Sequence, residues 1–198
     1  MNAVLNLFKM LVFLVVFNAQ AQGISSIPCP DLQVGQKVKF LVTEFSSTRK
    51  TEEVITKVEG GVVYTDSGNV YDIMWNMINV KGVAYAPKYY NHPECPFKLG
   101  QKQEGLPVSW DFRGKPTKAS LSISVDDKLT SVTTSLGTFD GVVKITSIGV
   151  YSAGGFSGTM ERITYYSPKL GLPVAVEFQN RPSSGARSAS KMELDQTP

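Results

Sequence analysis

The sequence predicts an all-β fold, either an antiparallel, strongly curved sheet or a β-sandwich of short strands, with few or no helices after the N-terminal segment. Three observations predict it. Apolar and polar residues alternate with a period of two in many short runs, helical periodicity is almost absent, and turns rich in glycine, proline or asparagine separate the runs. Short strands joined by such turns are typical of antiparallel sheets.

The first half of the chain contains runs that favour strands and hairpins. In one of them, Val38, Phe40 and Val42 share a face. Gly60-Gly61 separates two β-branched runs and predicts a hairpin turn between them. The less regular segment 74–105, rich in tyrosine, proline and asparagine, is expected to join two groups of strands. The predicted strands of this half are residues 38–42, 54–58, 62–65 and 70–73.

The clearest strand covers residues 119–125, where Ala119, Leu121, Ile123 and Val125 alternate with serines. This pattern predicts a strand with one buried and one solvated face. The glycine-rich segment 149–158 is interpreted as a loop. The other predicted strands of the second half are residues 129–135, 138–147, 159–166 and 172–178.

The two ends of the chain differ from the strand-rich part. Residues 180–198 offer little to bury, so they are predicted to form a disordered polar tail. Residues 1–21 carry Lys9, an apolar run and an Ala-x-Ala box ending at Ala21, which is the layout of a cleaved signal peptide. The apolar run is much shorter than the about 20 residues of a membrane-spanning helix. The all-β domain is expected to cover residues 22–179, as one unit or as two lobes, 22–95 and 96–179.

The exported chain is expected to be soluble, in the periplasm or secreted, with no transmembrane span after cleavage. A lipid-anchored protein needs a cysteine directly at its cleavage site. Here the first cysteine is Cys29, which follows Pro28 and lies beyond the Ala-x-Ala box.

Cys29 and Cys95 are the only cysteines. In an exported protein, two such cysteines are expected to form a disulfide, while free thiols and a catalytic cysteine are the alternatives. Metal binding is not predicted because the chain has one histidine, His92, and too few further ligands. A bridge that closes so long a loop contributes about 4 kcal/mol in the chain-entropy model.

Charge and motifs exclude several functions. The net charge is +3, which falls by one when Lys9 leaves, and the basic residues are scattered, so no nucleic-acid partner is expected. Residues 154–158 resemble a serine-nucleophile elbow, but no helix pattern follows. His92 is interpreted as a loop residue, although Glu94 lies close enough in sequence to orient it. Adjacent carboxylates in a strand, such as Glu52-Glu53, point to opposite faces, and Asp126-Asp127 is interpreted as part of a turn. No catalytic residue, metal site or cofactor is therefore predicted.

Five aromatic residues gather in the irregular middle segment. Such residues line clefts for sugars or apolar ligands, and they also close the open end of a core. The sequence leaves both interpretations open. The candidate ligand surface consists of Tyr71, Trp75, Tyr85, Tyr89 and Tyr90.

Three motifs follow one another in the second half, with Pro96–Gln101 first, Leu136–Asp140 second and Glu161–Val174 third. In this order they resemble the uncharacterised bacterial exported β proteins called TapB-like, over about residues 96–178. Val34–Val38 is a weaker match to the first motif. The resemblance implies a bacterial envelope protein with an antiparallel β fold. It transfers no catalytic residue, since that family has none established.

These observations lead to three hypotheses. The first is a non-enzymatic exported protein that binds an envelope protein, through a sheet edge or the aromatic segment, or that supports another envelope component. The second is a carrier or sensor of an apolar ligand such as a lipid, since a curved sheet encloses apolar molecules well. The third and weakest is a hydrolase, for which neither a triad nor convergent carboxylates are present.

Overall fold

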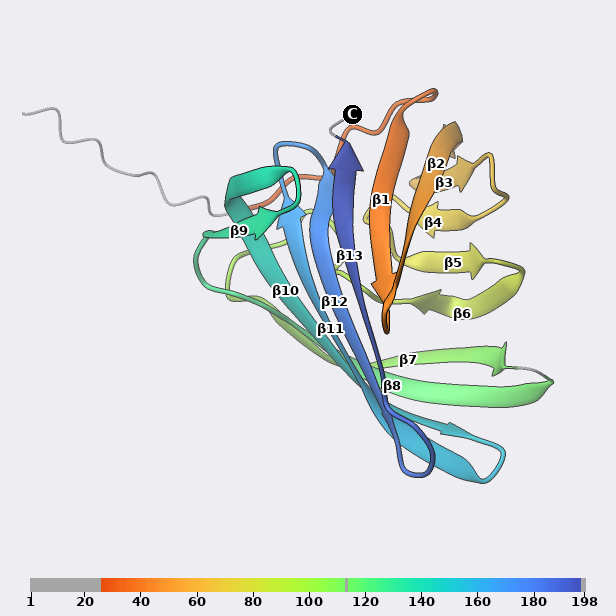
Figure 1. The fold of residues 1–198 in the computed structure, drawn as a ribbon. Coiled ribbons are helices and arrows are strands. Elements are labelled where there is room, and N and C mark those ends of the chain that lie inside the picture. Colours follow the sequence, from red (N-terminus) through yellow and green to blue (C-terminus); the bar gives the residue numbers. More distant parts are fainter. Residues whose placement is uncertain (1–25, 113, 197–198) are drawn as a thin grey trace, which may run out of the picture.

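The computed structural model describes residues 26–112 and 114–196, and every regular element in these ranges is a β-strand (Figure 1). The all-β prediction is confirmed, while the predicted signal peptide lies outside the described residues. The strands are β1 (Lys37–Glu44), β2 (Ser47–Glu59), β3 (Val62–Thr65), β4 (Val70–Asp72), β5 (Met77–Val80), β6 (Val83–Tyr89), β7 (Lys102–Phe112), β8 (Lys115–Val125), β9 (Thr130–Thr134), β10 (Gly137–Ala153), β11 (Phe156–Ser167), β12 (Leu172–Pro182) and β13 (Ser188–Gln196).

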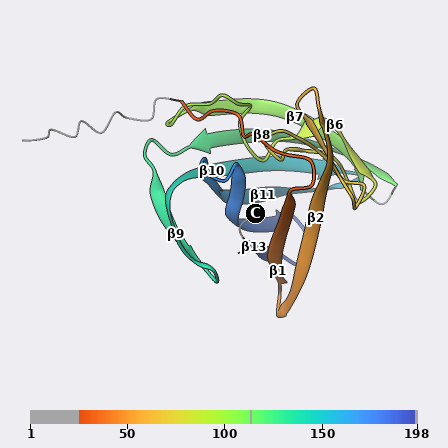
Figure 2. The ribbon, with the colours of Figure 1, turned by 90° about the horizontal axis from the view of Figure 1, so that it is seen from above.

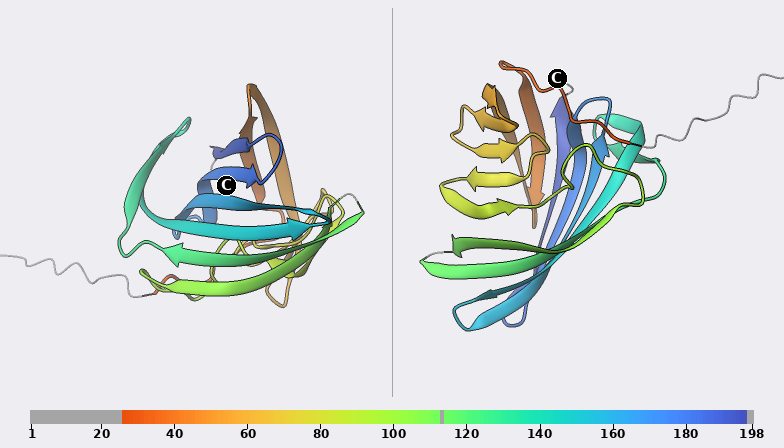
Figure 3. Two further views of the ribbon diagram at one scale, coloured as in Figure 1. Left: turned by 90° about the horizontal axis from the view of Figure 1, so that it is seen from below. Right: turned by 180° about the vertical axis from the view of Figure 1, so that it is seen from behind.

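The sheet closes on itself into a barrel of 12 strands. Each strand from β1 to β7 pairs antiparallel with the one that follows it, β8 pairs with β10, and β10 to β13 continue in order until β13 pairs with β1. The short β9 pairs with β10 outside this ring and stands apart from the other strands in Figure 2. In Figure 3, β7 and β8 are steeply inclined to the bundle of β10 to β13. The prediction of a curved antiparallel sheet or a sandwich is therefore correct for the strand type and direction. It is wrong about closure, because β13 pairs with β1 and the sheet forms a barrel.

The predicted disordered tail is also wrong. Residues 188–196 form β13, which pairs with β12 on one side and with β1 on the other. Pairing on both sides satisfies the backbone of a strand that buries few side chains, and Leu194 is fully buried. Composition alone missed the strand because its stability comes from its neighbours in the sheet. This strand closes the ring.

The core follows the alternation expected from the sequence. In β8, Ala119, Leu121, Ile123 and Val125 are buried, while Ser120 and Ser122 are exposed, which confirms the predicted half-buried strand. Similar inward-facing positions on the other strands build three apolar clusters inside the sheet. The interior is therefore lined by alternate residues of nearly every strand.

The predicted loop at 149–158 is instead part of a long hairpin. β10 continues to Ala153, β11 begins at Phe156, and only Gly154 and Gly155 form the turn. Two glycines inside these strands allow close packing: a Cβ at Gly149 would collide with Leu121, and one at Gly158 with the Tyr151 ring. Glycine is needed at these two strand positions because the side chains of Leu121 and Tyr151 lie against the backbone there. The glycine-rich composition therefore suggested a loop where the structure has strands.

The predicted disulfide is present. Cys29 and Cys95 are joined with an S–S distance of 2.05 Å, across a sequence separation of 66 residues. Beside it, the backbones of Ile27 and Phe97 exchange two hydrogen bonds of 2.7 and 3.1 Å, and both side chains are buried. The segment before β1 is thereby attached to the loop between β6 and β7.

Candidate functional site

An apolar cavity of about 540 Å³ lies between the inward faces of the sheet. This volume falls in the range of about 300–1,000 Å³ that is usual for ligand pockets. Residues of nine strands line the cavity, so no single segment of the sequence predicts it. The apolar residues on its walls include Val42, Met77, Met160, Val176, Phe178 and Met192.

Aromatic rings form two groups on the cavity wall. In the first group, Tyr85, Tyr89 and Trp110 contact one another with ring centroids 5.6 to 6.0 Å apart. In the second group, the rings of Tyr151 and Phe156 meet edge to face at 6.3 Å. Rigid aromatic walls of this kind give an apolar ligand a large contact area at little cost in side-chain entropy.

The structure separates the five aromatic residues of the predicted ligand surface. Tyr85 and Tyr89 line the cavity. Tyr71 and Trp75 pack against each other at 5.3 Å within a neighbouring part of the core, and Tyr90 packs beside two apolar clusters with Lys88 over its ring. The core interpretation therefore holds for Tyr71, Trp75 and Tyr90, while the ligand-surface interpretation of Tyr85 and Tyr89 stays a prediction.

Among the residues that the structure describes, Arg162 is the one charged residue on the cavity wall. Its Nε is buried without a hydrogen-bond partner, and its guanidinium forms no ion pair with any carboxylate of residues 26–112 or 114–196. Burial lowers the pKa of Arg162, but a guanidinium titrates so high that it stays positively charged. Burial also raises the pKa of Tyr89 to about 12, so this neighbouring phenol stays neutral and supplies no negative charge.

Sequence analysis missed Arg162, although one signal points to it. It shares the inward face of β11 with Met160 and Tyr166, so a charge interrupts an apolar face. Ile163 and Tyr165 make the opposite face equally apolar in sequence, and only the pairing with β10 and β12 shows which face is inside.

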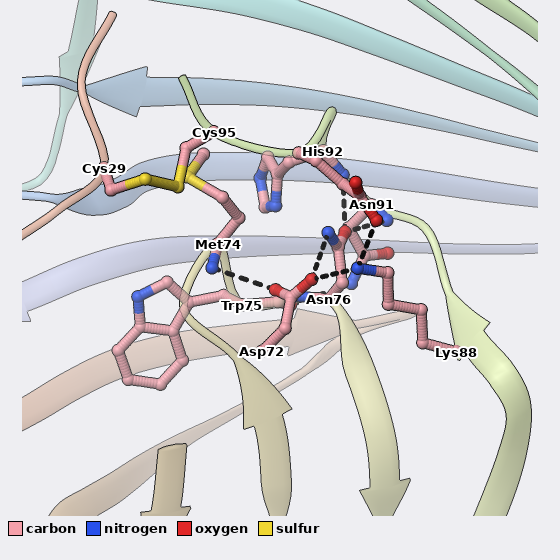
Figure 4. Close-up of polar contacts among 10 residues, drawn as sticks. Cys29, Asp72, Met74, Trp75, Asn76, Lys88, Asn91, His92 and Cys95 are labelled. Atoms are coloured by element: carbon pink, nitrogen blue, oxygen red, sulfur yellow. Dashed lines mark hydrogen bonds and ion pairs between the residues drawn. A yellow bond between two sulfur atoms is a disulfide. The ribbon is translucent and has the colours of Figure 1, made fainter. Parts of the chain in front are cut away.

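A buried polar network holds the segment between β4 and β6 in place (Figure 4). The Asp72 carboxylate accepts hydrogen bonds of 2.9 Å from the backbone of Met74 and Asn76, and one of 2.7 Å from Lys88. Asn76 Oδ1 accepts hydrogen bonds from the backbone of Asn91 and His92, at 2.6 and 2.7 Å. Each group is used for positioning, so this network is structural and explains how an irregular segment is held beside the disulfide.

His92 does not form the dyad with Glu94 that sequence proximity allowed. Glu94 points to solvent and pairs with Lys88 at 2.9 Å, while the His92 ring is fully buried and lies 6.0 Å from the ring of Tyr166. Burial lowers the pKa of His92 to about 3; the charge of Arg162 acts in the same direction, and Asp72 opposes it. His92 is therefore neutral at physiological pH. It lies in a loop, as the sequence predicted, and its ring is buried in the core.

The burial of His92 predicts a loss of stability in mild acid. Below about pH 6.5 the unfolded chain binds a proton that the folded chain does not, so the free energy of unfolding falls by about 1.4 kcal/mol per pH unit until about pH 3. We expect about 2 kcal/mol lower stability at about pH 5 than at about pH 7.5. Urea unfolding at both pH values measures it. The chain has one histidine, so His92→Gln is a clean control that should remove most of this difference. An unchanged pH slope in His92→Gln would contradict the assignment.

The paired carboxylates do not converge on a site. Glu52 pairs with Lys39 at 3.2 Å, whereas Glu53 accepts hydrogen bonds from Ser67 and Asn69. Asp126 directly follows β8, and its backbone donates a hydrogen bond to Lys144 and accepts one from Gly100. Over residues 26–112 and 114–196, no group of three or more histidine, cysteine, aspartate or glutamate residues is placed to hold a metal ion.

Comparison with known proteins shows how distant the chain is from them. No family model matches it, and no curated protein matches it. The fold is similar to that of the hypothetical lipoprotein YmcC from Escherichia coli (K12), with 9% identity, a TM-score of 0.45 and coverage of 81% of this chain and 84% of that one. It is also similar to a protein described as a lipoprotein from Parabacteroides distasonis, with 12% identity, a TM-score of 0.47 and coverage of 87% and 98%.

These similarities are too weak to carry an argument about function. The resemblance to TapB-like proteins stays a prediction, since no family model supports it. In the part of the chain that the structure describes, no helix has the length and apolar character needed to cross a bilayer.

Proposed function

We propose that the protein is an exported, non-enzymatic binding protein that carries or senses an apolar ligand inside its closed sheet. The observation that carries this proposal is the cavity of about 540 Å³ with its aromatic and aliphatic walls. An interior this large would ordinarily be filled by side chains at close packing. An apolar space left unfilled is suited to an apolar occupant.

The signal-peptide pattern and the disulfide support export. Disulfides persist in oxidising compartments, and Cys29–Cys95 is formed. Docking of a partner at a sheet edge receives less support, because each ring strand has two neighbours and β9 is the strand with a single one.

An uncharged fluorescent probe tests the proposal directly. N-phenyl-naphthylamine is expected to bind the purified protein with enhanced emission, and Ala153→Phe should weaken this binding at least about tenfold. Ala153 is buried and lines the cavity, so a phenyl group there occupies space that the probe needs. Such overpacking costs about 1–3 kcal/mol of stability, and thermal unfolding shows whether the variant still folds.

Ser152→Phe is the matched control. Ser152 is the preceding residue of β10 and points outward, so the same ring is added outside the cavity and the affinity should not change. Wild-type protein that fails to bind the probe, or a folded Ala153→Phe that binds it as wild type does, would overturn the proposal.

A further inference from the structure

We propose that the ligand is an amphiphile with a single anionic head group, a carboxylate or a phosphate, which binds Arg162 while its apolar chain fills the rest of the cavity. This inference rests on the proposed function and specifies its ligand class. It starts from the one feature of the cavity that an apolar ligand does not explain.

That feature is an unpaired charge on a largely apolar wall: the Arg162 side chain is partly exposed, but its Nε is buried. A buried guanidinium is stable only when hydrogen bonds and a counter-charge replace the water it has lost. Arg162 Nε has no partner, and the guanidinium forms no ion pair within the described part of the chain. The neighbouring phenols of Tyr71 and Tyr89 remain neutral, because burial raises the pKa of both. A ligand anion would supply the missing charge.

The surroundings of Arg162 suit a small head group. Arg162 lies opposite Ser147 on β10 and Phe178 on β12. Asn180 lies two residues beyond Phe178 on the same face of β12, opposite Met160. Asn180 also lines the cavity, and its Oδ1 is buried without a hydrogen-bond partner. The unpaired Asn180 atom is an acceptor, so it does not itself bind an anion; it marks a second polar position on the cavity wall, and the anion is bound by Arg162. Planar guanidinium groups bind carboxylates and phosphates with two parallel hydrogen bonds.

The position of Arg162 along the strand gives the ligand a direction. Arg162 lies six positions along β11 from Phe156, which follows the β10–β11 turn, and this corresponds to roughly 20 Å of strand. Phe156, Ala153 and Pro182 line the cavity near the hairpin turns. Beyond Arg162 on the same face, Thr164 and Tyr166 are buried in the core. The head group is thus bound at the inner end, and the chain extends toward the hairpin turns.

Titration calorimetry with a matched ligand series tests the inference. The probes are dodecanoate, dodecyl phosphate, dodecanol and dodecyltrimethylammonium, which share one chain and differ in head group. For the wild-type protein we expect an anionic probe to bind about tenfold to a hundredfold more tightly than dodecanol, and the cation to bind most weakly. The ratio of the two anions shows whether a carboxylate or a phosphate fits better.

Two arginine variants locate the effect. Arg162→Met keeps a long side chain without charge and should remove the preference for the anions, leaving the affinity for dodecanol within about threefold. Arg162→Lys should retain part of the preference. Arg181→Met is the control, because Arg181 is a half-exposed arginine on β12 that lies outside the cavity lining.

The outcomes separate the two proposals. Binding of dodecanol and N-phenyl-naphthylamine without any preference for anions, in wild type and in Arg162→Met alike, would overturn the anionic head group and leave the apolar cavity supported. Failure of every probe would overturn both. The head-group series on wild-type protein needs no variant, so it decides the question even if Arg162→Met does not fold.

Discussion

A chain that ends at Arg187 is expected to be unfolded. Its loss of β13 removes six paired residues from β1 and six from β12, together with the fully buried Leu194. Each backbone hydrogen bond contributes about 1 kcal/mol, and burial of one leucine contributes about 2 kcal/mol. Together, the lost hydrogen bonds and the lost burial of Leu194 are comparable to the about 5–15 kcal/mol by which domains are ordinarily stable. Circular dichroism and urea unfolding of the truncated chain measure the effect.

A chain that ends at Gln196 is the control for this truncation, since it keeps every residue of β13. Leu194→Ala in the full chain removes only one buried side chain of β13, and it should lower the free energy of unfolding by about 2–5 kcal/mol. A cooperative unfolding transition of wild-type amplitude in the chain ending at Arg187 would contradict the role of β13 as the closing strand.

Loss of the disulfide is expected to lower the free energy of unfolding by about 4 kcal/mol. The bridge between Cys29 and Cys95 closes a long loop, and without it the unfolded chain gains conformational freedom. The comparison uses the double variant Cys29→Ser/Cys95→Ser, which leaves no unpaired thiol, and urea unfolding gives the difference.

Wild-type protein in a reducing buffer is the matched control for this double variant, and the two should unfold at similar urea concentrations. Removal of the bridge should also loosen the segment around Ile27, so its amide, which bonds to Phe97, is expected to exchange with solvent faster. A stability difference below about 1 kcal/mol would show that packing of Ile27 and Phe97 holds this segment without the bridge.

The sequence was most informative where a local pattern decides the structure. The alternation from Ala119 to Val125, the turn at Gly60-Gly61 and the pairing of Cys29 with Cys95 each depend on residues whose chemistry restricts the chain directly. Strand β13 could not be predicted in this way. Its residues are mostly polar, and it is ordered because β12 and β1 provide hydrogen-bonding partners on both sides.

The candidate site was only partly predictable for the same reason. Tyr85 and Tyr89 were selected for their composition and do line the cavity, whereas Tyr71 and Trp75 satisfy the same criterion and pack elsewhere. Arg162 becomes significant only when closure of the sheet shows which face of β11 is inside. A cavity assembled from nine strands is a property of the closed ring, so residue-by-residue patterns do not contain it.

Closure of the ring also bears on the order in which the protein folds. Lys39 near the start of the sheet pairs with Gln196 near its end, whereas most other neighbouring strands follow one another along the chain. Contacts between such distant residues are slow to form, because the loop entropy is lost before the contact is gained. The consecutive hairpins are able to form early, but β13 is the last strand of the ring to be synthesised. The cavity inside the ring is therefore among the last parts of the fold to form, and a ligand can bind there only after β13 has paired with β1.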